Sequence, residues 1–238
     1  MPHERSHIVS SYEQELDQLR AMVAQMGHIV EEQVSLALLA IAEHDEAAAD
    51  EATRRDPEVD ELERDVETLV IRLLALRSPM GADLREIVAA LKITGDLERI
   101  GDYAASIARK AIKAASSEAQ ISFSGLRSMC RLVRDNLSRT VEAVIQHDPN
   151  MAMEVWHADR GVDEHYVALF RELVTYMMED ARNIRACTEL LFIAKNLERI
   201  GDHATNMAER VFYSVTGENL PPERPRGENS MRKLNREI

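Results

Sequence analysis

Four pairs of acidic residues, each pair one helical turn apart, are the residues of this chain most able to do chemistry. They are Asp56 and Asp60, Glu98 and Asp102, Asp159 and Asp163, and Glu198 and Asp202. In an α-helix this interval places both side chains of a pair on the same face. Because like charges held so close together repel one another, the spacing favours a cation among the carboxylates.

Carboxylate oxygens suit Mg²⁺, Mn²⁺, Ca²⁺ or iron, and carboxylates from neighbouring helices can bridge more than one ion. Zinc is a less natural occupant without His or Cys ligands. The competing interpretation is a set of solvated acids paired with arginines such as Arg99 or Arg109. The recurrence of every pair favours metal binding.

The recurrence belongs to an internal repeat. The hexapeptide Leu97–Asp102 is identical to Leu197–Asp202, and His44-Asp45 recurs as His147-Asp148 at a slightly longer offset. A repeat of this length indicates one helical unit used twice.

Composition predicts an all-α protein: 45% of the residues are hydrophobic and 30% charged, whereas only 4% are aromatic. The net charge of −13 argues against nucleic acid as a partner.

The longest apolar stretch, 34–42, is too short to span a bilayer and no basic-then-apolar leader opens the chain, so we expect a cytoplasmic protein without direct membrane insertion. Cys130 and Cys187 have no metal or redox spacing and are expected to be reduced thiols.

Hydrophobic periodicity predicts three helical segments in each repeat. The segments are 11–44, 46–77 and 83–113, then 126–147, 152–178 and 184–216. The first carries an apolar stripe from Leu16 to Ile41, and the second one from Val59 to Leu76. Short connections predict two tandem antiparallel three-helix bundles, at 6–115 and 122–216, followed by a disordered tail at 217–238.

Two features interrupt these helices. Pro57 would break the second segment unless a helix starts beside it, so Asp56 is expected to be an N-cap and 46–55 a separate piece. Gly101 and Gly201 weaken otherwise good helices, and the close approach of another helix or an ion would explain them.

Other motifs carry less weight. His3-Glu4-Arg5-Ser6-His7 fits a zinc-protease pattern but lies at the chain terminus, and Glu154 with His157 lacks the second Glu-x-x-His motif that a di-iron site needs. His203 directly follows Asp202, but Tyr103 occupies the matching place, which favours a hydrogen-bonded or exposed His. Two alternatives remain open: a carboxylate-bridged metalloenzyme and a metal-free helical scaffold.

The chain resembles the PhoU family. The resemblance rests on the duplicated L-E-R-I-G-D-[HY]-A segments, the D-x-x-x-D helix before each, and an opening with His7-Ile8, Glu15–Leu19 and Met26-Gly27. It covers about 6–216 and implies two three-helix bundles with pseudo-twofold symmetry. It also implies a possible multinuclear cluster of iron, Mn, Mg or Zn, with ligands at the four acidic pairs. Lys195-Asn196 replaces Gly95-Asp96 of the first copy, which distinguishes the second site from the first.

The resemblance further implies regulation without catalysis. Such a protein would link the ATPase subunit of a phosphate ABC transporter to a phosphate-sensing histidine kinase. It would act as a negative regulator of the phosphate-starvation response and phosphate uptake, as a homodimer recruited peripherally to the inner membrane face through its partners.

Overall fold

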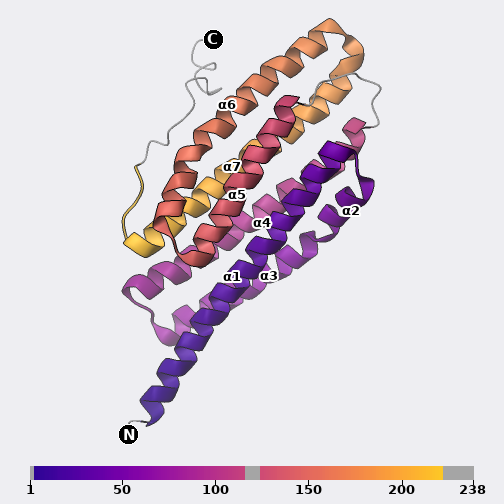
Figure 1. Cartoon of the computed structure of the whole chain (residues 1–238). Helices are drawn as coiled ribbons and strands as arrows, with labels where there is room; N and C mark the ends of the chain where they lie inside the picture. Colours follow the sequence, from indigo (N-terminus) through magenta and orange to yellow (C-terminus); the bar gives the residue numbers. More distant parts are fainter. Residues whose placement is uncertain (1–2, 116–123, 222–238) are drawn as a thin grey trace.

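The computed structural model describes residues 3–115 and 124–221, and within these ranges all regular structure is helical (Figure 1). The elements are α1 (His3–Glu43), α2 (Glu46–Arg54), α3 (Asp56–Arg77), α4 (Gly81–Ala115), α5 (Ser124–Gln146), α6 (Pro149–Glu179), the 3₁₀ turn η1 (Ala181–Asn183) and α7 (Ile184–Thr216). All six predicted segments are present, and the second is divided into α2 and α3 as the proline required.

The helices form two three-helix bundles that lie side by side. In the first, α1 and the α2–α3 pair pack on α4, and in the second, α5 and α6 pack on α7. The bundles are joined mainly by α4 against α7, and also by α1 against α5. Figure 1 shows α3 and α6 on opposite flanks of this arrangement. The predicted all-α fold of tandem bundles is confirmed.

Equivalent residues of the two repeats meet between α4 and α7. The rings of Tyr103 and His203 lie 5.7 Å apart between centroids. Asp96 Oδ1 lies 2.8 Å from His203 Nδ1, while Asn196, the counterpart of Asp96, donates to Ser106 Oγ at 3.0 Å. A pseudo-twofold axis therefore passes beside the Tyr103–His203 pair, as the resemblance implied.

The repeated His-Asp pair ends one helix and starts the next. His44 and His147 have φ of 56° and 52°, a left-handed conformation that stops the preceding helix. Asp45 and Asp148 follow as N-caps, with Asp45 accepting a hydrogen bond from the Ala48 backbone N–H at 3.0 Å. The repeat is thus explained by local backbone structure.

The prediction that Asp56 is an N-cap is wrong. Helix α3 begins at Asp56 itself, and the cap position is occupied by Arg55, which makes no side-chain cap hydrogen bond. Pro57 lies in the first turn, where its missing N–H is tolerated. The Asp56 carboxylate instead accepts a hydrogen bond from Gln33 Nε2 at 3.3 Å, so it faces α1.

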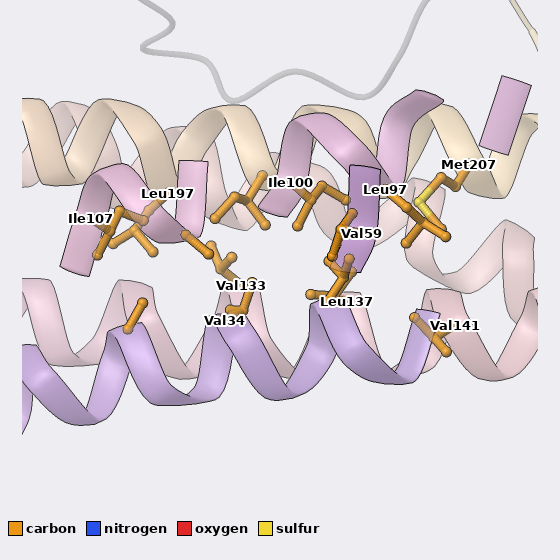
Figure 2. Close-up of a cluster of buried hydrophobic side chains, with 14 of the residues drawn as sticks. Val34, Val59, Leu97, Ile100, Ile107, Val133, Leu137, Val141, Leu197 and Met207 are labelled. Atoms are coloured by element: carbon orange, nitrogen blue, oxygen red, sulfur yellow. The ribbon is translucent and has the colours of Figure 1, made fainter. Parts of the chain in front are cut away.

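One continuous apolar core runs through both bundles. Figure 2 shows part of it, with labelled side chains from α1, α3, α4, α5 and α7, namely Val34, Val59, Leu97, Ile100, Ile107, Val133, Leu137, Val141, Leu197 and Met207. The stripe from Leu16 to Ile41 is buried as predicted, whereas Leu76, in the last turn of α3, is 69% exposed. Cys130 and Cys187 are buried free thiols.

Parts of the predicted organisation lie outside the described residues, namely 222–238 of the expected disordered tail and the start of the second predicted domain at 122–123. The domain boundaries stay a prediction.

No helix in the described part of the chain is both long and apolar enough to cross a membrane.

Glu86 on α4 ties the two bundles together electrostatically. Its carboxylate accepts hydrogen bonds from Arg20 Nε of α1 at 2.6 Å and lies 3.3 Å from Nε2 of His147, which follows α5. Burial alone would raise the pKa of Glu86, but the hydrogen bonds from His147 and Arg20 outweigh it and hold the pKa at about 2. The bond to Glu86 raises the pKa of His147, against the effect of burial.

These shifts predict how stability depends on pH. The raised pKa of His147 stabilises the fold below its unfolded value of 6.5, and this contribution is lost as pH rises through the folded pKa. The Glu86 contribution is present above 4.5 and is lost as pH falls toward 2. Glu86→Gln should lower the free energy of unfolding by about 2 kcal/mol near pH 6 and flatten the decline from there to pH 8. Urea denaturation across this range measures both effects, with the exposed Glu13→Gln as control; an unchanged decline in E86Q would contradict the assignment.

Candidate metal centre

The acidic pairs of the first bundle share one face between α3 and α4. Asp56 and Asp60 lie in the first turns of α3. Helix α3 packs on α4 near Gly101, where an added Cβ would lie 3.6 Å from Val59, and this part of α4 carries Glu98 and Asp102. Asp56 feels the charges of Asp102 and Asp60, and Glu98 feels those of Asp102, Glu63 and Asp60. The structure therefore brings together the four predicted residues of this bundle and adds Glu63.

This face is strongly anionic. Burial, followed by repulsion from Asp102 and Asp60, raises the pKa of Asp56. Burial and then repulsion from neighbouring carboxylates likewise raise the pKa values of Glu98 and Glu63. Arg109 acts on Asp56, and Arg99 acts on Glu98 and Glu63, in the opposite direction, but more weakly than the burial and the repulsion. Among the described residues, no salt bridge to any of these five carboxylates is formed. The face thus has a surplus of negative charge that a cation would relieve.

A buried amide forms the inner wall of the same face. Gln33 is fully buried, and its Nε2 donates to the Ala52 carbonyl at 2.9 Å and to Asp56, which fixes the orientation of the amide. Its Oε1 is buried without a hydrogen-bond partner and would lie 2.9 Å from a Cβ added at Gly101. Gly101 leaves the space that this oxygen occupies, and Gln33 presents a neutral oxygen beside the carboxylates.

The first bundle has donors that suit a hard divalent cation. Its oxygens come from five carboxylates and one orphaned amide, which is the chemistry that Mg²⁺ or Mn²⁺ prefers. Within residues 3–115 and 124–221, no group of three or more His, Cys, Asp or Glu side chains is already placed to hold a metal. Ion binding would therefore require these side chains to turn toward one another.

The second bundle differs at this face. Asp159 is buried where Asp56 is half-buried, whereas the other three acids have the same exposure as their counterparts in the first bundle. The ammonium of Lys195 contacts the Glu198 carboxylate directly. The three aspartates also have interaction partners. The four predicted residues of this bundle thus share their face with a built-in positive charge.

Sequence reasoning missed several of the residues that shape these faces. Glu63 lies at the position of Tyr166 in the repeat, so the duplication gave no second acid to reveal it. His203 bonds Asp96 rather than joining the acidic face, as its unmatched position suggested. Arg199 lies over the Tyr103 ring, 5.5 Å from Cζ to centroid.

Repulsion within the first acidic face predicts that losing one charge stabilises the metal-free protein. Glu98→Gln should raise the free energy of unfolding by about 0.5 kcal/mol near neutral pH. Because the folded pKa of this acid is raised, the cost of its charge is absent below the unfolded value of 4.5 and complete above the folded value. The gain should therefore vanish on acidification to about pH 4. Urea denaturation in EDTA measures it, with Glu61→Gln on the exposed side of α3 as control, and a loss of stability in E98Q at neutral pH would refute the repulsion.

Comparison with known proteins matches both repeats. The family model described as "PhoU domain" matches residues 23–111 and again 126–211. A "Phosphate-specific transport system accessory protein PhoU homolog" from Caulobacter vibrioides (strain NA1000 / CB15N) is 46% identical over 221 residues, which are 92% of this chain and 96% of that protein. The protein of the same description from Xylella fastidiosa (strain 9a5c) is 44% identical over 94% of each chain.

Solved structures agree with the fold. The crystal structure of PhoU from Pseudomonas aeruginosa has a TM-score of 0.84 and 36% identity, and it covers 87% of this chain and 100% of that chain. The phosphate transport system regulatory protein PhoU from Streptococcus pneumoniae has a TM-score of 0.81 and 31% identity, over 88% of this chain and 99% of that chain. With both repeats matched and the relatives aligned along nearly their whole length, the chain belongs to the PhoU family.

Proposed function

We propose that this protein is the accessory and regulatory component of a phosphate-specific transport system. It would link the ATPase subunit of the phosphate ABC transporter to a phosphate-sensing histidine kinase and act as a negative regulator of phosphate uptake and of the phosphate-starvation response. The observation that carries the proposal is 46% identity to an accessory protein of this system over 92% of the chain.

The family is one of accessory and regulatory proteins and not of enzymes, which removes the metalloenzyme alternative. The fold suits an adaptor, because the long faces of α1, α3, α5 and α6 are held by a continuous core. Such faces could present fixed side chains to two protein partners at once. We place the protein in the cytoplasm as a homodimer, recruited to the inner membrane face through these partners.

We also propose that the first acidic face binds a divalent cation, as one ion or a small cluster. Asp56, Asp60, Glu98 and Asp102 would supply charged oxygens, with Glu63 beside them. What supports this is the mutual repulsion of these groups and the unpartnered Gln33 oxygen next to them. A cation bound here would tie α3 to α4 and stiffen the first bundle.

A reporter strain tests the regulatory proposal. Deleting the gene should raise alkaline phosphatase output in phosphate-rich medium severalfold, because restraint on the starvation genes is lost, and the wild-type gene should restore low output. Low output in the deletion strain would contradict the proposed role, provided that no paralogue is present in the genome.

The same strain tests whether the first acidic face is needed. Complementation with Glu98→Gln/Asp102→Asn should leave output high, since the cation site is lost. The matched control is Glu61→Gln/Asp65→Asn, an exposed acidic pair with the same spacing on α3, which should restore low output. Immunoblots must show equal protein levels. Full repression by the E98Q/D102N protein would show that regulation does not depend on this face.

A further inference from the structure

The two repeats place different residues at a pair of facing positions beside the acids. In the first bundle these are Glu63 on α3 and Gly95 on α4, and a Cβ added at Gly95 would lie 3.7 Å from Glu63 Oε1. In the second bundle the same positions hold Tyr166 on α6 and Lys195 on α7. Lys195 Nζ lies 5.3 Å from the centroid of the Tyr166 ring, so the two positions face one another in both bundles.

The Lys195 side chain places its positive charge at the acidic face of the second bundle. Its ammonium contacts Glu198 Oε2, and the Glu198 side chain is only 15% exposed. The Tyr166 ring supports the ammonium from the other side through a cation–π contact. The position that carries no side chain in the first bundle therefore carries a 40% exposed lysine paired with Glu198 in the second.

The exchange changes the charge of the face in two ways. Tyr166 removes the acid that Glu63 contributes in the first bundle, and Lys195 adds a positive charge. A divalent cation at the second face would lose one carboxylate ligand, compete with the ammonium for Glu198, and be repelled by that ammonium. The second bundle also has Asn136 at the position of Gln33, a shorter side chain with less reach toward the face.

We propose that Lys195 is the resident counter-ion of the second acidic face, so that a divalent cation binds at the first face alone. This inference rests on the proposed cation site in the first bundle. It makes the two halves of the duplicated protein unequal. The first half responds to metal supply, whereas the second has part of its negative charge offset by its own Lys195 side chain.

Mn²⁺ titration of the full chain tests the difference, with free Mn²⁺ followed by electron paramagnetic resonance. Wild type should bind Mn²⁺ at the first bundle, with affinity at the second bundle weaker by at least about tenfold. Lys195→Met keeps the stem and removes the charge, and Tyr166→Glu/Lys195→Gly copies the first face. Each of these two variants should bind Mn²⁺ at a second class of sites, whereas Lys195→Arg, which keeps the positive charge, should not. Gly95→Lys should weaken the first site by about tenfold or more, and the space beside Gly95 admits the new side chain.

A metal-free measurement tests the counter-ion role separately. In EDTA, Lys195→Met should lower the Tm by about 2 °C, because it removes the counter-ion of the second acidic face. Equal Mn²⁺ affinity at both faces of the wild type, or no change in Mn²⁺ binding in K195M, would overturn the inference. If neither wild type nor the Y166E/K195G protein binds Mn²⁺, the cation site itself is refuted, while the reporter assay still decides the regulatory function.

Discussion

Helices α4 and α7 each pack against the other helices of their own bundle and also against one another. The positions of all other helices depend on this contact between α4 and α7. Ala104, Ala108, Ala204 and Ala208 are essentially fully buried, and such small residues allow the backbones to approach closely. Among them lies Asp96, only 5% exposed, which contacts both His203 and Arg210 of α7. A buried carboxylate needs such partners, and His203 and Arg210 supply them across the contact between α4 and α7.

The acidic pairs of α4 and α7 are next to different helices. Glu98 feels the charges of Asp60 and Glu63 on α3, whereas Glu198 and Asp202 lie on α7, which packs against α6. Figure 1 shows α3 and α6 on opposite flanks. The two faces share their backbone frame but not their charge. Gly101 and Gly201 leave room for neighbouring side chains in both copies, since added Cβ atoms would lie only 2.9 Å from Gln33 and 3.2 Å from Val162. Glu63 and Lys195 make the difference, and each occurs in one copy only.

Much of the helical arrangement could be predicted from the sequence, because helices and their buried sides depend on the local spacing of residues. The apolar stripe from Leu16 to Ile41 predicted the buried side of α1, and Pro57 predicted the division between α2 and α3. The partner of Asp56 could not be predicted, because Gln33 reaches it from a helix far away in sequence. Glu63 could not be predicted either, because its proximity to Glu98 depends on how α3 packs against α4. Periodicity also failed at Leu76, because a helix end can extend past its packing partners.

The central claim is that one duplicated fold carries two unequal acidic faces, one suited to a divalent cation and the other holding Lys195 as an internal counter-ion of Glu198. Anomalous diffraction from a crystal grown with Mn²⁺ would test it most directly, because it locates the ion in each half of the same molecule. The account predicts an anomalous peak beside Glu98 and Asp102 and none beside Glu198 and Asp202, where the Lys195 ammonium should occupy the face. Peaks of equal height in both bundles, or a peak in the second bundle alone, would contradict it.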